Sequence, residues 1–271
     1  MQEAVDDWNK FLKKTHDEQT LARVGNKVVK YASLEEMNKV ITKNNLCFND
    51  VLENPQLMLR YASVKRQYDI CKSPTHEQKL RYAFDLYCKS PHPFKPSSAS
   101  YFLKKYKSRV AVLDPTMGWG GRLVGATAVG VPKYIGIDSN VNLKPCYDKI
   151  LSVIQPNNIL LDLRFQDALS VDYSQLEYDV VMTSPPYFNI EIYPHMKKRT
   201  KQEWIREFYN PLFESIWMNL KHGGYLLLNI NDEMYEKAFK PLLGECSEKE
   251  IILRQTPANS KKKEYMYVWI K

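Results

Sequence analysis

Short apolar runs alternate with longer amphipathic stretches in the second half of the chain. The first five runs lie at residues 109–114, 133–138, 158–163, 178–184 and 224–230. The stretches between them are long enough to hold helices, and such spacing is typical of βαβ units in a parallel sheet that is buried on both faces. The pattern therefore predicts five parallel strands.

Two more apolar runs follow at residues 250–255 and 264–270. Only eight residues, TPANSKKK, separate them, which is too few for a crossover that contains a helix, so we expect an antiparallel hairpin. Together the runs predict an α/β fold with a seven-stranded, mostly parallel sheet whose last strand is antiparallel.

The first 91 residues have a helical pattern instead. In SLEEMNKVITKN and THEQKLRYAFDLYCKS, apolar residues recur at spacings of three and four, and no long β-branched run occurs. Three prolines between Ser90 and Ser98 then forbid a continuous helix. We therefore expect two parts: a helical N-terminal region over residues 1–91 and an α/β domain over residues 92–271.

The amino-acid composition indicates that the chain can form a large core and that it carries excess positive charge. Hydrophobic residues make up 44% of the 271 positions, and 39 lysines and arginines against 31 acidic residues leave a net charge of +8. That excess suits a polyanionic partner such as nucleic acid. No apolar run approaches the roughly 18–20 residues that cross a bilayer, so a soluble, intracellular protein is expected.

Cysteine and histidine usage gives no sign of a metal site. Five cysteines are scattered without a C-x-x-C pair, which favours reduced thiols over a disulfide framework or a zinc cluster. The five histidines show no ligand spacing. No metal is therefore assigned.

A glycine-rich turn follows the first predicted strand. In LDPTMGWGG, Asp114 ends the strand, and Gly118, Gly120 and Gly121 precede a helix expected from about Arg122. Without a Cβ these glycines let a ligand approach the backbone, although a tight turn in any α/β protein has the same feature. The turn lacks the G-x-G-x-x-G order and the chain has no G-K-[ST] loop, which weakens NAD and nucleoside triphosphates as ligands.

Acidic residues stand near the ends of the next two predicted strands. Asp138 closes KYIGID, about where a doubly wound fold places the carboxylate that binds ribose hydroxyls. Asp167 follows the third run, where its side chain could meet the edge of an adenine. Each alone fits a helix cap as well. Together with Asp114 they favour a nucleoside ligand without phosphates, and S-adenosylmethionine (SAM) fits that description.

The fourth predicted strand ends in the tetrapeptide Ser184-Pro185-Pro186-Tyr187. The prolines stiffen the loop and remove two backbone donors, which leaves carbonyls that accept hydrogen bonds from an exocyclic amine. Ser184 adds a hydroxyl, and Tyr187 adds a flat ring on which a base stacks for about 1–3 kcal/mol. The alternative is a strand stop with a core tyrosine.

From about residue 92 onward the chain resembles the SAM-dependent amino-group DNA methyltransferases, which have a Rossmann-like class I fold. Asp114, Gly118 and Gly120 match the family's glycine motif. Asp138 matches its ribose-binding acid, and Asp167 matches its adenine-edge acid. Residues 184–187 match its (S/N/D)-P-P-(Y/F/W) tetrapeptide. The resemblance implies a seven-stranded sheet with a reversed last strand, in agreement with the hydrophobic pattern.

The resemblance also implies SAM as the cofactor and assigns residues to its site. The expected cofactor-binding residues are Phe94, Pro96, Ser98, Asp114, Pro115, Gly118, Trp119, Gly120, Asp138, Ser139, Asp167 and Ala168. The expected catalytic residues are Ser184, Pro185, Pro186 and Tyr187. The implied reaction is direct methyl transfer to a flipped base, without a metal or a covalent intermediate.

The first position of the tetrapeptide bears on the target. Serine is commonest there in family members that methylate N4 of cytosine in DNA, so that target is preferred over N6 of adenine. RNA and protein amide methyltransferases carry related tetrapeptides. A catalytically silent SAM-fold subunit that binds nucleic acid is a further alternative.

Two basic runs flank the expected crevice. The expected DNA-binding residues are Lys197, Lys198, Arg199, Lys261, Lys262 and Lys263. A charge run is often only a solvated face, but two runs beside one crevice favour phosphate contacts.

Family members that read a defined sequence carry a recognition domain, either between the glycine motif and the tetrapeptide or after the sheet. Only 70 residues separate Asp114 from Ser184, which leaves no room for such a domain between the two motifs. Target recognition is therefore expected from region 1–91, from the 188–202 loop or from a partner.

Overall fold

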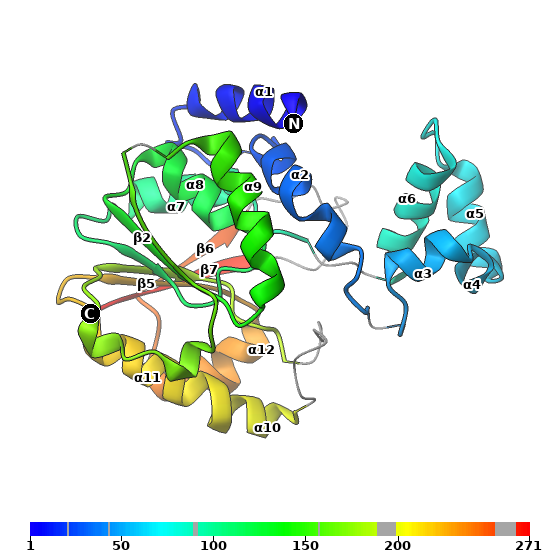
Figure 1. Ribbon diagram of the computed structural model, residues 1–271. Helices are drawn as coiled ribbons and strands as arrows, with labels where there is room; N and C mark the ends of the chain where they lie inside the picture. The colour runs from blue at the N-terminus through cyan, green and yellow to red at the C-terminus, as the bar shows by residue number, and fades with distance from the viewer. Residues whose placement is uncertain (21, 43, 89–91, 157, 189–198, 253–263) are drawn as a thin grey trace. The chain divides into compact units, whose positions relative to one another are not determined.

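The computed structural model describes residues 1–20, 22–42, 44–88, 92–156, 158–188, 199–252 and 264–271 (Figure 1). Contacts within the chain divide it into two compact units, which are described separately. The first unit contains Met1–Ser33, Pro93–Tyr187 and Thr200–Lys271, and the second contains Leu34–His92 and Phe188–Arg199.

The first unit is built on a mixed sheet that has seven strands in the described residues. The strands are β1 (Val112–Asp114), β2 (Lys133–Ile137), β3 (Leu160–Arg164), β4 (Val180–Thr183), β5 (Tyr225–Ile230), β6 (Glu248–Ile252) and β7 (Glu264–Ile270). Their order across the sheet is β3-β2-β1-β4-β5-β7-β6. Each predicted apolar run contains one strand or overlaps with it, so the seven-stranded sheet is confirmed.

The direction of the strands also agrees with the prediction. Strands β1 to β5 pair in parallel, whereas β7 lies between β5 and β6 and is antiparallel to both. On the central strand β1, Val112 lies beside Tyr134 of β2 and Val180 of β4. Every residue of β1 and β4 is buried, as expected for central strands covered on both faces.

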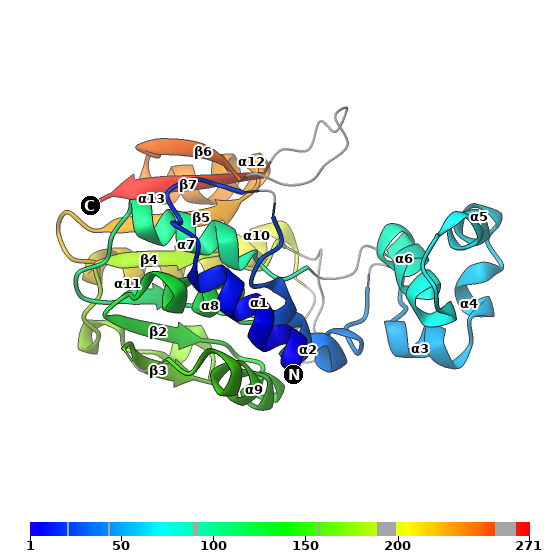
Figure 2. The same cartoon turned by 90° about the horizontal axis from the view of Figure 1, so that it is seen from above.

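Helices cover both faces of this sheet (Figures 1 and 2). One face carries α7 (Pro96–Lys105), α8 (Gly121–Val129) and α9 (Lys144–Ile154), and the other carries α10 (Lys201–Trp204), α11 (Asn210–Asn219) and α12 (Asp232–Met234). Shorter helical elements in this unit are η1 (Val141–Leu143), η2 (Ala168–Ser170), η3 (Tyr173–Gln175), η4 (Ile205–Tyr209), η5 (Tyr235–Phe239) and α13 (Lys240–Leu243). In the described part of the chain, no helix is both long and apolar enough to cross a membrane.

The N-terminal helix α1 (Gln2–Leu12) belongs to the sheet unit. Its buried residues Ala4, Trp8 and Phe11 recur at the spacing of one helical face, and the helix contacts α9. Residues 1–33 therefore group with the α/β unit, whereas the sequence placed the boundary at residue 91. The amphipathic pattern predicts a buried face but does not say which surface covers it.

The second unit contains four helices in the described residues: α3 (Phe48–Glu53), α4 (Gln56–Leu59), α5 (Ala62–Ile70) and α6 (His76–Cys88). Helix α2 (Asn26–Met37) runs across the division between the units. The core of the second unit is formed by apolar side chains that include Phe48, Val51, Met58, Val64, Leu80 and Phe84. Helix α6 lies where the pattern in THEQKLRYAFDLYCKS predicts it.

Candidate active site

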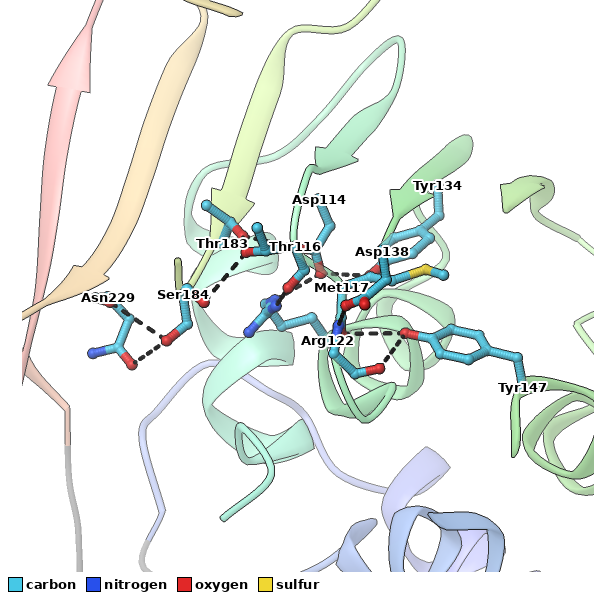
Figure 3. A network of polar contacts seen from close by, with 11 residues as sticks. Asp114, Thr116, Met117, Arg122, Tyr134, Asp138, Tyr147, Thr183, Ser184 and Asn229 are labelled. Carbon is cyan, nitrogen blue, oxygen red and sulfur yellow. Dashed lines mark hydrogen bonds and ion pairs between the residues drawn. The ribbon is translucent and has the colours of Figure 1, made fainter. Parts of the chain in front are cut away.

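The strand order reverses between β1 and β4, which pair directly. In an open α/β sheet, ligands bind outside the carboxyl ends of the strands at such a switch point. Figure 3 shows that the ends of β1, β2, β4 and β5 carry polar side chains, which form one network of hydrogen bonds. This edge of the sheet is the candidate active site.

Asp114, the last residue of β1, is at the centre of the network. Its carboxylate accepts hydrogen bonds from Arg122 Nε at 2.6 Å, from Tyr134 Oη at 2.6 Å and from Thr183 Oγ1 at 2.9 Å (Figure 3). Asp114 is fully buried, and burial together with this carboxylate raises the pKa of Tyr134 well above its usual value. Asp114 was predicted as a cofactor contact; in the structure its carboxylate lies in the interior, where it fixes three neighbouring elements.

Arg122, in the first turn of α8, is bonded to the glycine turn through its guanidinium group. Its guanidinium pairs with Asp114 and donates to the carbonyl of Thr116, and it lies 5.5 Å from the ring centre of Phe94. Burial disfavours the charged guanidinium, but the Asp114 carboxylate outweighs burial and raises the pKa of Arg122. A buried pair of this kind is costly to break from one side.

The glycine turn is closed onto the end of β2 by Asp138. The Asp138 carboxylate accepts from Gly118 N at 2.8 Å and from Asn140 N at 2.9 Å. Gly118 and Gly120 have φ values of 55° and 86°, which glycine adopts without strain. Tyr147 Oη, on α9, lies 3.1 Å from the carbonyl oxygen of Gly118 and donates to it. Asp138 is half-buried and adjoins the turn. Its contact with ribose stays a prediction.

Other predicted cofactor residues surround this turn. Pro115 and Trp119 are buried, and Ser139 is exposed. Asp167 is exposed and its carboxylate accepts from Leu169 N at 3.0 Å, which makes it the N-cap of η2, while Ala168 is buried. The capping bond uses one carboxylate oxygen of Asp167, and it is compatible with a ligand contact to the other oxygen.

The segment from Phe94 to Ser98 lies against α8, beside the glycine turn. A Cβ added at Gly121 would lie 1.9 Å from the carbonyl oxygen of Phe94, and one added at Gly125 would lie 2.7 Å from that of Pro96. Helices α7 and α8 therefore approach closely only because these positions lack a side chain. Phe94 is half-buried, and Pro96 and Ser98 are buried in the first turn of α7.

The tetrapeptide follows β4 and is held by bonds to both neighbouring strands. Ser184 O accepts from Thr116 Oγ1 at 3.3 Å, and Pro186 O accepts from Tyr209 Oη at 2.5 Å. Tyr187 Oη donates to the carbonyl oxygen of Asn229, on β5, at 2.8 Å. Pro185 is buried, and Ser184, Pro186 and Tyr187 are half-buried. All four predicted catalytic residues thus lie at the switch point.

The predicted DNA-binding residues lie almost entirely outside the described part of the chain. This holds for Lys197, Lys198, Lys261, Lys262 and Lys263. Arg199 is described and half-buried. The phosphate contacts stay a prediction.

Sequence reasoning did not single out several residues of the network (Figure 3), among them Thr116, Arg122, Tyr134, Tyr147, Thr183 and Asn229. Tyr134, Thr183 and Asn229 stand within apolar strands, and a polar residue at a buried strand position was the signal that could have found them, because buried polar groups require partners. Arg122 could have been found as a charge that opens a helix otherwise composed of small and apolar residues.

The chain was compared with family models, with curated proteins and with solved structures, and the solved structures include similar folds. No family model matches the chain, and no curated protein matches it in sequence. Among solved structures, the chain is similar to TrmN from Thermus thermophilus, with 14% identity, 86% of this chain and 80% of that chain covered, and a TM-score of 0.50.

Two other similar structures have lower scores. A putative class I SAM-dependent methyltransferase from Listeria monocytogenes is 17% identical over 100% of this chain and 88% of its own, with a TM-score of 0.49. An rRNA methylase from Streptococcus thermophilus is 16% identical over 67% and 97% of the two chains, with a TM-score of 0.44. The strand order and the likeness to TrmN show that the fold is the Rossmann-like fold of class I methyltransferases.

Proposed function

We propose that the chain is a SAM-dependent methyltransferase that methylates the exocyclic amine of a nucleic-acid base. The observation that carries the proposal is the position of Ser184 and Tyr187. Both residues follow the carboxyl end of β4, and both hydroxyls lie against Asn229 of the neighbouring strand β5. On its other side β4 pairs with β1, which leads into the glycine turn. Ser184, as the acceptor for an amine, and the Tyr187 ring, as the stacking surface for a base, are thus close to the glycine turn, which is suited to a nucleoside.

The residues around the glycine turn suit SAM. Among the described residues other than its two chain neighbours, the closest atom to a Cβ added at Gly118 is Thr116 O at 3.9 Å, so this side of the turn is open to a ligand. Asp138 places a half-buried carboxylate at the end of the next strand, beside the turn, where it also accepts from Gly118 N and Asn140 N. Asp167 offers a further exposed carboxylate. When bound, SAM supplies a methyl group activated by its sulfonium.

The tetrapeptide then holds the target amine. Ser184 Oγ and the Pro185 carbonyl accept the two N–H groups, which orients the nitrogen lone pair toward the methyl group, and the Tyr187 ring stacks on the base. The neighbouring carbonyls of Ser184 and Pro186 are already bonded to Thr116 and Tyr209, which fixes the loop on both sides of Pro185. Such pre-organisation is what a direct transfer requires.

Within this class we prefer N4 of cytosine in DNA, because serine opens the tetrapeptide; N6 of adenine is the alternative. The test is transfer of a tritiated methyl group from SAM to DNA, RNA and protein offered in parallel. Mass spectrometry of the product nucleosides then identifies the methylated base. The expected product is N4-methylcytosine in DNA, and label in RNA or protein alone would assign another substrate class.

A pair of tyrosine variants tests the site itself. Tyr187→Ala removes the stacking ring and is expected to lower transfer by about 10- to 100-fold. Tyr31→Ala, an exposed tyrosine on α2, serves as the matched control with unchanged transfer. Full activity of Tyr187→Ala would contradict the mechanism, and a wild-type chain that fails to bind SAM in calorimetry would indicate a silent subunit.

A further inference from the structure

Asn229 is a buried polar residue in the strand beside the tetrapeptide. It is 2% exposed, lies on β5 and pairs in register with Met266 of β7. Its amide nitrogen donates to the carbonyl oxygen of Tyr265 at 3.1 Å. A carbonyl can only accept, so this bond fixes the amide: Nδ2 faces β7, and Oδ1 faces the tetrapeptide.

The fixed amide determines where the Ser184 proton points. Ser184 Oγ lies 3.3 Å from Asn229 Oδ1 and 3.5 Å from Asn229 O (Figure 3). It also lies 3.4 Å from Tyr187 Oη. The two Asn229 oxygens can only accept, and the Tyr187 proton is used by Asn229 O at 2.8 Å. In each arrangement the Ser184 hydroxyl donates toward the pair formed by Asn229 and Tyr187. The Ser184 lone pairs therefore face away from that pair.

We propose that Asn229 is a positioning residue that makes Ser184 a hydrogen-bond acceptor and so selects a base edge that carries an amine. The inference rests on the proposed methyl transfer. A serine hydroxyl left to rotate can either donate or accept, and a donating Ser184 would suit a carbonyl edge such as O4 of uracil. With its proton used by Asn229, Ser184 suits the N–H donors of N4 in cytosine or N6 in adenine. The same residue holds the Tyr187 ring through its backbone carbonyl.

The sharpest test is Asn229→Asp, assayed as a function of pH. The neutral acid reproduces the asparagine pattern, because its O–H can donate to the Tyr265 carbonyl while its other oxygen accepts from Ser184. The carboxylate has no donor and repels that carbonyl. Burial favours the neutral form, so the variant should be active at the acidic end of the range and lose activity as the pH rises. We expect kcat to fall by roughly 10- to 100-fold between the two forms, with the affinity for SAM unchanged.

Asn219→Asp is the matched control. Asn219 Nδ2 donates to the carbonyl of Ser215 at 2.9 Å on α11, away from the tetrapeptide, so the same substitution should leave kcat and its pH profile like those of the wild type. Thermal unfolding and SAM calorimetry at each pH show whether Asn229→Asp is folded where it is inactive. If it is not, Tyr187→Phe decides, because it keeps the ring and removes only the hydroxyl bonded to Asn229; its kcat should fall by roughly 3- to 10-fold at constant SAM affinity.

The outcomes separate the inference from the function on which it rests. A wild-type chain that binds SAM and methylates an amine, combined with a flat pH profile for folded Asn229→Asp, would overturn the inference alone. Loss of SAM affinity in step with kcat would also overturn it, because it would reveal a general structural defect. A wild-type chain that neither binds SAM nor transfers methyl would overturn the proposed function and the inference together.

Discussion

The hydroxyl oxygens of Thr116 and Thr183 lie 2.6 Å apart and join the glycine turn to the last residue of β4. Thr183 donates to Asp114 at 2.9 Å, so Thr116 supplies the proton for the bond between the two threonines. The same Thr116 proton is shared with the carbonyl oxygen of Ser184, which lies 3.3 Å from Thr116 Oγ1. One line of hydrogen bonds thus connects the turn proposed to hold SAM with the tetrapeptide proposed to hold the amine.

Removing the middle hydroxyl of this line should cost stability. Thr183→Val keeps the shape of the side chain but leaves the fully buried Asp114 carboxylate without one donor, for which we expect a loss of about 1–3 kcal/mol in urea unfolding. Thr127→Val is the control, because Thr127 donates only within its own helix, to Leu123 O at 3.0 Å. Equal stability of the two variants would show that the donor to Asp114 is dispensable.

A comparison of two aspartates after β3 tests whether Asp167 is only a helix cap or also a cofactor contact. Asp167 and Asp172 each cap a single helical turn by accepting a backbone N–H at 3.0 Å, from Leu169 and Ser174 respectively. If Asp167 also binds adenine, Asp167→Ala should weaken SAM binding by roughly tenfold in calorimetry, the effect of removing one hydrogen bond, whereas Asp172→Ala should not. Equal SAM affinities for the two variants would leave Asp167 with the capping role alone.

The contact between α7 and α8 predicts a sharp effect at Gly121. In Gly121→Ala the new Cβ would meet the main-chain oxygen of Phe94, so α7 must shift, and we expect about 1–3 kcal/mol of destabilisation with weaker SAM binding. Gly130→Asn is the control: among the described residues nothing lies within 4 Å of its added Cβ, and asparagine tolerates φ of 65°. Thermal unfolding compares them, and a Gly121→Ala variant as stable as Gly130→Asn would contradict the close approach.

A charge cluster at the edge of the sheet predicts acid sensitivity. Lys105 Nζ lies 2.8 Å from Glu250 and 3.2 Å from Glu248. Burial raises the pKa of Glu250, but Lys105, Tyr101 and Gln19 together outweigh burial, so the net pKa is lowered. The Tyr106 hydroxyl and then Lys105 lower the pKa of Glu248. Carboxyl groups with a lowered folded pKa stabilise the fold above the unfolded pKa, and this contribution is lost as the pH falls through the folded pKa.

Lys105→Met should therefore lower stability at neutral pH by at most about 1 kcal/mol, since the cluster is partly exposed, and the difference from the wild type should shrink as the pH falls through the carboxyl range. Urea unfolding at several pH values measures this. Lys27→Met removes a more exposed pair with Glu3 and serves as the comparison: Lys27 also lowers the pKa of Glu3, but solvent screens this pair, so a smaller effect in the same direction is expected. A gap between wild type and Lys105→Met that stays constant in acid would refute the assignment.

Neutralising the basic run after the tetrapeptide tests the DNA contacts. Replacement of Lys197, Lys198 and Arg199 by alanine should weaken DNA binding and reduce the slope of log affinity against log salt by about one for each phosphate that the variant no longer neutralises. Lys201→Ala is a matched control in the same run, because Lys201 pairs with Glu233 at 2.5 Å. An unchanged salt slope in the triple variant would count against these contacts.

The strands and the main motifs could be predicted because their signals are local. Central parallel strands appear as continuous apolar runs, so all seven were found, and the short spacing before residue 264 indicated the antiparallel last strand. Asp138 and Ser184 follow such runs directly, which places them at the carboxyl edge of the sheet once the strands are parallel.

The contacts that connect these motifs could not be predicted, because they depend on strand order. Thr183 reaches Asp114, which is 69 residues earlier in the sequence, only because β4 inserts beside β1. Asn229 meets Tyr265 only because β7 enters next to β5. Likewise, the apolar stripe of α1 is visible in the sequence, whereas its packing against α9 is a property of the folded unit.

The insertion of β7 between β5 and β6 has a consequence for biosynthesis. A nascent chain that has reached Ile252 but not Glu264 has β5 and β6 without the strand that joins them, and Asn229 lacks the Tyr265 carbonyl that fixes its amide. The tetrapeptide, already translated by then, would still have an undirected Ser184 hydroxyl. On this structure the contacts that fix Asn229 beside the tetrapeptide are complete only after the residues of β7 have been translated and have paired with β5.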